Sequence, residues 1–198
     1  MNAKRDQTQD QILDAAYQRF VKYGFKKTAM AEIASDCQMS TANLYRYFTN
    51  KRDIGVGVVR RFVEHSRSLA EEFTQAKGLS NRQRIEGFVL ETLRFNHHTF
   101  SEQFHLFELV QFISTEHLDM AKEHMKIKRG MLALMLRQGG ESGEFQVEQL
   151  EVTAEALFVA LIKFLMPHFL MLHASPLKEL EKQLAAVMDL VVSGLSAK

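Results

Sequence analysis

The segment MSTANLYRYFTNKRD, residues 39–53, brings hydroxyl, ammonium and guanidinium groups together in one short run. Tyr47 and Lys51 are four positions apart, so on a helix their donor groups would share a face. Such donors bind phosphate oxygens, and the guanidinium of Arg46 can also bind base edges. The same amphipathic side chains can instead cover a helical core. The segment therefore offers a choice between packing and the binding of a polyanion.

Helical spacing and capping signals surround this segment. A capping box and periodic apolar residues predict a first helix over about 9–23, ended by Gly24. Thr28 can cap a short second helix and Ser40 a third, with only residues 36–39 between them. Two short helices around such a turn form the helix-turn-helix pattern, in which the second helix enters the major groove.

The third predicted helix divides the segment between two tasks. Leu44 and Phe48 share a face and are expected to pack on the first two helices. Short and polar side chains at the start of the helix fit close to base edges, and the donors that follow reach phosphates. The candidate DNA-binding residues are Thr28, Ser40, Thr41, Ala42, Asn43, Tyr45, Arg46, Tyr47 and Lys51.

The order of these features resembles the tetracycline-repressor (TetR) family of bacterial transcription regulators. The resemblance lies in IASDCQMSTANLYRYFTNKRDI, residues 33–54, and in YGFKKTAMAEIA, residues 23–34. It implies a homodimer whose heads bind a palindromic operator in double-stranded DNA and whose bodies bind a small-molecule effector. It also implies base or sugar contacts for Thr41, Ala42, Tyr45 and Arg46, and phosphate contacts for Thr28, Tyr47 and Lys51.

Two positions depart from the family pattern. Gln38 stands where the family usually has glycine in the turn, and glutamine tolerates a positive φ less well, so either the turn differs slightly from the family's or its backbone is strained. Asn43 stands where threonine is common, which leaves the half-site sequence open.

Helical patterns continue through the rest of the chain without an alternating strand pattern, so the predicted fold class is all-α. Boundaries between 96 and 116 stay open, and QGGESGEF, residues 138–145, is predicted as a loop. The predicted domains are a DNA-binding head, 1–54, and a ligand-binding and dimerisation body, 55–198. Further helices are expected over about 51–75, 80–95, 125–137, 148–173 with a kink at Pro167, and onward from Ser175–Pro176.

Aromatic and methionine side chains in the body are candidate walls for an apolar or aromatic effector, although residues at helical spacing also form plain cores. The candidates are Phe95, His98, Phe104, Phe107, Phe112, Met131, Met135, Phe158 and Ile162. The last two helices are rich in apolar residues, which either complete the core or, as the resemblance implies, pair with a second subunit. The candidate interface residues are Val152, Ala156, Val159, Lys163, Leu184, Val187, Met188 and Val191.

Charge is distributed unevenly along the chain. Residues 1–67 carry 12 Lys and Arg against 7 Asp and Glu, a formal charge of +5, whereas the remaining residues carry −4. A basic head on an acidic body favours two functions in one chain. The total of +1 is low for an architectural, nonspecific DNA-binding protein, which is the nearest alternative.

Motifs for catalysis are absent from the sequence. There is no phosphate-binding glycine loop, nucleophile elbow or compact metal motif, so we predict no enzyme activity, cofactor or metal. Five histidines fall within 97–124, and we interpret them as solvated or hydrogen-bonded, with a polar ligand anchor as the second interpretation. Cys37 is either a small buried residue or a redox switch, the latter disfavoured by Asp36. No membrane span or secretory signal is recognised, so we expect a cytoplasmic protein.

Overall fold

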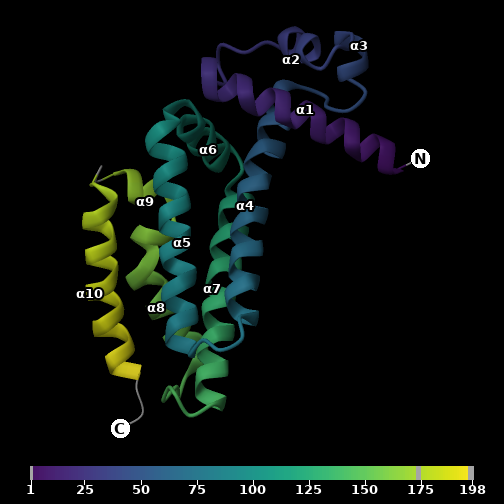
Figure 1. The fold of residues 1–198 in the computed structure, drawn as a ribbon. Helices are drawn as coiled ribbons and strands as arrows, with labels where there is room; N and C mark the ends of the chain where they lie inside the picture. Colours follow the sequence, from purple (N-terminus) through teal and green to yellow (C-terminus); the bar gives the residue numbers. More distant parts are fainter. Residues whose placement is uncertain (1, 173–174, 196–198) are drawn as a thin grey trace. The chain divides into compact units, whose positions relative to one another are not determined.

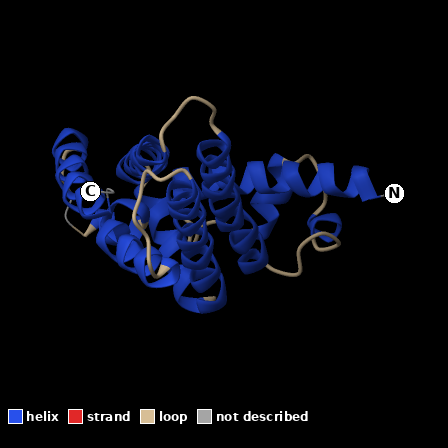
Figure 2. Cartoon of the chain, turned by 90° about the horizontal axis from the view of Figure 1, so that it is seen from below, coloured by secondary structure: helices blue, strands red, loops and turns tan. Residues whose placement is uncertain are grey.

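The computed structural model describes residues 2–172 and 175–195, and all regular elements within these ranges are helices (Figures 1 and 2). No strand occurs among the described residues, so the expected all-α class is confirmed. None of the described helices is long and apolar enough to cross a bilayer. The helices are α1 (Asn2–Tyr23), α2 (Met30–Asp36), α3 (Thr41–Leu44), α4 (Lys51–Gln75), α5 (Asn81–Glu102), α6 (Phe104–Glu116), α7 (Leu118–Glu141), α8 (Leu150–Leu165), α9 (Pro167–Met171) and α10 (Leu177–Leu195).

The chain divides into two compact units. The first unit comprises Met1–Glu64 and Glu102–Leu118, and the second comprises His65–Ser101 and Asp119–Lys198. The first unit thus contains α6 as well as the helix-turn-helix, whereas α4 supplies residues to both. The predicted boundary between a DNA-binding head, 1–54, and a ligand-binding body, 55–198, is a functional division and stays a prediction.

The core of the first unit follows the helical spacing of its sequence. Ile12, Ala16 and Phe20 are four residues apart on α1 and are all fully buried. Leu44 of α3 is also fully buried, as its spacing predicted. Ring contacts extend this core, because Phe20 meets Phe25 edge to face with 5.2 Å between their centroids.

The ends of α1, α2 and α3 correct three expectations. Helix α1 begins at Asn2, well before residue 9. Helix α2 follows Ala29, whose N–H donates to the Glu32 carboxylate at 2.7 Å, so Thr28 is not its cap. Helix α3 ends at Leu44, and turns replace the helix expected to continue to Phe48. Its predicted cap is confirmed, because the Ser40 hydroxyl accepts from the Asn43 N–H at 3.1 Å.

Helix α4 has the predicted bounds, Lys51–Gln75. The Asn50 side chain accepts from the Asp53 N–H at 2.9 Å and donates to the Asp53 carboxylate at 3.2 Å. Asn50 therefore supplies the side-chain cap that stops the turn after α3 and starts the long helix.

In the second unit, the breaks follow proline and capping signals. Helix α8 ends at Leu165 and α9 restarts at Pro167, so the predicted kink is a full interruption at Met166. The expected end near His173 lies outside the described residues. Helix α10 begins at Leu177, directly after the Ser175–Pro176 signal.

Helix α7 is longer at both ends than the predicted 125–137. It includes Gln138, Gly139 and Gly140, which were predicted to be loop. A Cβ added to Gly139 would lie 2.1 Å from the Phe145 ring, so this glycine allows the ring to pack against the helix. Tertiary packing thus overrides the loop signal of the two glycines.

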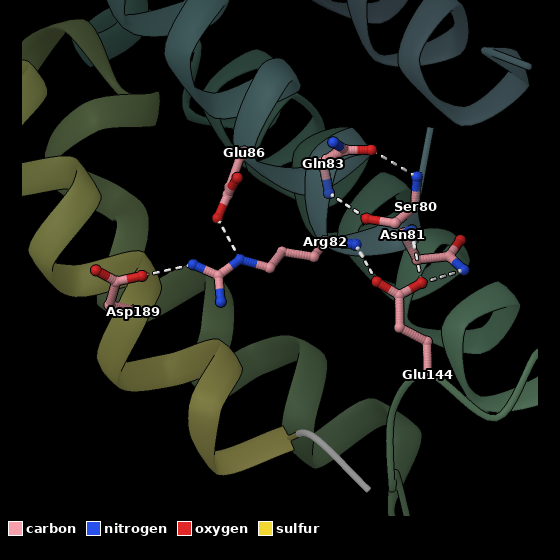
Figure 3. A network of polar contacts seen from close by, with 7 residues as sticks. All are labelled: Ser80, Asn81, Arg82, Gln83, Glu86, Glu144 and Asp189. Carbon is pink, nitrogen blue, oxygen red and sulfur yellow. Dashed lines mark hydrogen bonds and ion pairs between the residues drawn. The ribbon is translucent and has the colours of Figure 1, made fainter. Parts of the chain in front are cut away.

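The start of α5 is held by a polar network (Figure 3). The Ser80 N–H donates to the Gln83 side chain, and the Ser80 hydroxyl accepts from the Gln83 N–H, which completes a capping box. The Glu144 carboxylate accepts from the N–H groups of Asn81 and Arg82 at 2.7 and 2.9 Å. The Arg82 side chain pairs with Glu86 on α5 and Asp189 on α10.

Candidate nucleic-acid interface and ligand sites

The turn between α2 and α3 depends on a left-handed residue. Gln38 has φ 53°, and no other non-glycine residue among those described has a positive φ. This conformation lets the Met39 N–H reach the Ala34 carbonyl at 3.0 Å, after the Gln38 N–H has bonded Ser35. Of the two alternatives for this position, the structure has the strained one, because glutamine adopts a positive φ where the family usually has glycine.

Several predicted DNA-binding residues are accessible around α3. Ala42, Tyr45 and Arg46 are exposed, with Tyr45 52% exposed, whereas Thr41, Asn43 and Tyr47 are half-buried. Ser40 is exposed, but its hydroxyl already caps α3. The exposed group offers a phenol, a guanidinium and a methyl side chain to a partner surface.

Thr28 does not lie on that exposed surface. It is only 3% exposed, and its hydroxyl donates to the Gly24 carbonyl at 2.9 Å. In this conformation the hydroxyl stabilises the end of α1 and is turned to the protein interior, so the predicted phosphate contact is not available to it.

Lys51 is also occupied within the protein. Its ammonium donates to the carbonyl oxygens of Phe25, Lys26 and Thr28 at 2.7, 3.2 and 2.6 Å. It also lies 4.8 Å from the centroid of the Phe25 ring. An ammonium has three donors, so none is left for the predicted phosphate. Burial lowers the pKa of Lys51, and the nearby Glu32 charge opposes this effect.

An ion-pair cluster that the sequence reasoning missed joins α1 to α2. Arg19 forms a two-point contact with Asp36, one bond of which is 2.9 Å, and approaches Glu32 at 3.3 Å. The hydrogen bond from Arg19 lowers the pKa of Asp36. The acids are four apart on α2, which was the available signal. Part of the positive charge of the head is thus used internally.

Cys37 is half-buried in the turn, and its Sγ donates to the Gln11 carbonyl at 3.8 Å. Burial raises the pKa of the Cys37 thiol, and the Asp36 charge raises it further. A raised pKa disfavours the reactive thiolate, in agreement with the preferred structural interpretation.

An aromatic cavity of about 470 Å³ lies in the first unit between the turn after α1 and helix α6. Three predicted pocket residues, Phe104, Phe107 and Phe112, line it. The sequence reasoning missed the other wall, where the Phe25 ring packs at a tilt against Phe112 with 5.5 Å between centroids. That wall and its rim comprise Tyr23, Gly24, Phe25, Lys26 and Lys27, and His105, Glu108, Leu109 and Gln111 complete the lining.

The other predicted pocket residues belong to the second unit. Met135 and Phe158 are buried in its core, and Met131 and Ile162 pack against that core. The Phe95 ring packs at a tilt against His65 with 4.1 Å between ring centroids, whereas His98 is exposed. The predicted pocket set is therefore divided between the two compact units.

The predicted interface residues on α8 and α10 also separate into two groups. Val152 and Val159 are 62% and 57% exposed, and Ala156 is exposed, whereas Val187 and Val191 are half-buried.

Leu184 and Met188 are 4% and 1% exposed, so they belong to the core of one chain, which corrects their prediction as interface residues. Lys163 donates to Gln183 of α10 at 2.7 Å. Leu190, 78% exposed, was missed.

Comparisons with known proteins agree with this architecture. The family described as "Tetracyclin repressor-like, C-terminal domain" matches residues 81–188, and "Bacterial regulatory proteins, tetR family" matches residues 12–55. A "Probable HTH-type transcriptional regulator YttP" of Bacillus subtilis is 23% identical over 139 residues, which are 70% of this chain and 67% of that protein.

Two further relatives match in different ways. The "HTH-type transcriptional activator FasR" of Mycolicibacterium smegmatis is 31% identical over 94 residues, but the match covers 48% of this chain and 42% of FasR. The crystal structure of a transcriptional regulator from Cytophaga hutchinsonii has a TM-score of 0.73 at 22% identity, covering 94% of this chain and 97% of that chain. The structural likeness shows a shared fold.

Proposed function

Because the chain belongs to the TetR family of bacterial transcription regulators, we propose that it is a repressor that binds a palindromic operator as a homodimer and leaves it when a small effector binds. Family regulators carry a DNA-binding helix-turn-helix, and in this chain it comprises α2, the Gln38 turn and α3. The observation that carries the proposal is the exposed group Ala42, Tyr45 and Arg46 at this motif.

The DNA contacts are assigned by exposure and chemistry. Arg46 reads a base edge, because an exposed guanidinium can donate two parallel hydrogen bonds to guanine. Ala42 allows close approach to the groove, and Tyr45 contacts a base or sugar. The half-buried Thr41, Asn43 and Tyr47 lie at the margin of this surface, where Tyr47 donates to a phosphate.

A titration tests this assignment. Fluorescence anisotropy measures the affinity of wild type for labelled duplexes from the promoter of its own gene and for random duplex at fixed salt. We expect Arg46→Ala to weaken operator binding more than random binding, whereas Lys77→Ala, which removes an exposed charge from the connection after α4, leaves the ratio unchanged. Equal affinity of wild type for all duplexes would instead support an architectural binder.

The dimer is supported by the exposed apolar face of α8 and α10. These helices lie side by side in the second unit, and Val152, Val159 and Leu190 are exposed on them. A two-fold pairing of this face would bury these side chains and supply two heads for a palindrome. Light scattering at micromolar concentration should give twice the chain mass for wild type and the monomer mass for Val159→Glu. A monomeric wild type would contradict the dimer.

The effector is proposed to bind among the helices of the second unit, where the C-terminal family match lies. Helix α4 contributes to both units, so a shift of this helix on binding would alter the spacing of the two heads and lower operator affinity. Repression predicts raised promoter activity when the gene is deleted. Lowered activity would instead indicate an activator.

The aromatic cavity of the first unit is a second candidate place for an apolar effector. Its volume of about 470 Å³ suits a small ligand, and it touches the turn whose carbonyls Lys51 holds. We expect Phe107→Ala to weaken the binding of an effector that uses this cavity. Phe158→Leu, in the core of the second unit, provides the comparison in the same titration.

A further inference from the structure

Lys128 on α7 is a cation without a described anionic partner. It is only 1% exposed, and its ammonium donates to the Leu165 carbonyl at 2.5 Å. Burial lowers the pKa of Lys128 to about 7, because it disfavours the charged form of the side chain. A buried lysine is normally paired, because removing an ammonium from water is costly. One backbone acceptor therefore leaves part of the donor capacity of Lys128 unused.

Other polar groups with unused capacity lie on the same two helices. His124 is one turn before Lys128 on α7, and its Nε2 is enclosed without a hydrogen-bond partner. Burial, and then the Lys128 charge, lowers the pKa of His124 to about 3. On α5, Asn96 donates to the same Leu165 carbonyl at 3.2 Å, and the enclosed Thr92 hydroxyl one turn earlier has no partner.

These groups share one chemical character. The Lys128 ammonium and the Asn96 amide converge on the Leu165 carbonyl at the end of α8, and the His124 ring and Thr92 hydroxyl, one turn earlier on the same two helices, can each donate a hydrogen bond. The complementary ligand group is an anionic acceptor. A single cation matches a carboxylate, whereas a phosphate monoester would bring a second negative charge into the same buried place.

Helices α5 and α7, which carry these polar groups, also contribute to the apolar core of the second unit. Met131, Ile162 and Met166 pack against the core of the second unit, and methionine side chains adapt to ligands of different shape. We infer that the second unit binds a carboxylic acid with an apolar body, whose carboxylate is held by Lys128 together with His124 and Asn96. The inference names the class of the effector and rests on the proposed function only for its effect on DNA binding.

The test compares carboxylates with alcohols of the same skeleton. Isothermal titration of the full chain uses hexanoate, octanoate, decanoate and benzoate, each beside its alcohol. The affinity for the preferred carboxylate should exceed the affinity for its alcohol by about tenfold or more, as expected for a charge-assisted hydrogen bond. At pH 8 its binding should also take up protons, measured in two buffers of different ionisation enthalpy, because an anion favours the charged form of Lys128.

Two lysine variants on α7 separate this role from a structural one. Lys128→Met should remove both the carboxylate preference and the proton uptake, while Lys126→Met, at an exposed position, should keep both. Circular dichroism reports whether Lys128→Met folds, and His124→Phe provides a second variant with the same expected loss of preference. Equal affinity of wild type for acids and alcohols, binding of no member of the series, or an unchanged preference in Lys128→Met would each overturn the inference.

Operator titrations without any ligand test the proposed operator-binding function separately from the carboxylate site. Failure of wild type to prefer operator DNA would refute the proposed function and leave the calorimetric result intact. Carboxylate binding that fails to release a bound operator would keep the site and remove its regulatory role. Release by alcohols and acids alike would keep the proposed function and contradict the carboxylate site.

Discussion

The ammonium of Lys51 lies 2.6 Å from the carbonyl oxygen of Thr28. Lys51 is the first residue of α4, and Thr28 lies two residues before the start of α2 at Met30. Two further bonds to Phe25 and Lys26 fix the turn that enters the helix-turn-helix. Lys51 is thus a positioning residue for the DNA-binding head, because its charge compensates carbonyls that would otherwise need other donors.

Replacing Lys51 separates this role from a phosphate contact. Lys51→Met should lower the free energy of unfolding by about 1–3 kcal/mol in urea titrations, since three carbonyls lose a charged donor. Operator affinity should fall, yet the slope of its logarithm against that of salt should stay the same. Lys26→Met, at an exposed position, should change stability little. A slope reduced by about one would instead show that Lys51 binds a phosphate.

The backbone of Gln38 is strained in the turn between α2 and α3, because this residue adopts φ 53°. Gln38→Gly should raise the free energy of unfolding by about 0.5–1 kcal/mol, since glycine adopts this conformation without a Cβ clash. Thermal and urea unfolding measure the change. Gln38→Ala keeps the Cβ and should not gain stability. An equal gain in both variants would point to the glutamine side chain as the cause.

Glu144 should make stability depend on acid pH. Burial favours the neutral acid, but hydrogen bonds from Arg82 and Asn81 prevail and lower the pKa of Glu144 below its ordinary 4.5. The folded pKa lies below the unfolded one, so the stabilisation is complete above about pH 4.5 and is lost as pH falls through the folded pKa. Glu144→Gln should cost about 1 kcal/mol at pH 7.

The free energy of unfolding, measured for wild type and Glu144→Gln from pH 7 to pH 3, tests whether the Glu144 charge stabilises the start of α5. The difference between wild type and Glu144→Gln should narrow on acidification, because protonation removes the same charge from wild type. Glu141→Gln, at an exposed position near the end of α7, should follow wild type. A difference independent of pH would show that shape and not charge stabilises the start of α5.

Two adjacent glycines of α7 should respond oppositely to alanine. Gly139→Ala places a methyl group 2.1 Å from the Phe145 ring, which should cost about 1–3 kcal/mol through overpacking. A methyl group on Gly140 meets nothing within 4 Å, so Gly140→Ala should gain up to about 1 kcal/mol from helix propensity. Urea unfolding compares the two. Equal effects would contradict the packing of Phe145 on α7.

Local signals accounted for the elements that depend on nearby residues. The bounds of α4, the Ser40 cap and the break at Pro167 were predictable, because caps and proline act within a few residues. The end of α3 at Leu44 was not, since the same residues can form a longer helix or a turn. The outcome depends on packing between segments distant in sequence.

The sequence by itself determined the all-α class, the helix-turn-helix and the buried position of Leu44. These follow from periodicity, capping and motif order, which are local properties. Only the tertiary structure decided that Thr28 and Lys51 are bonded internally and that Lys128 is buried without a described anion. The reason is that a polar side chain is chemically alike on a surface and in a core, and only the surrounding fold determines which partners it meets.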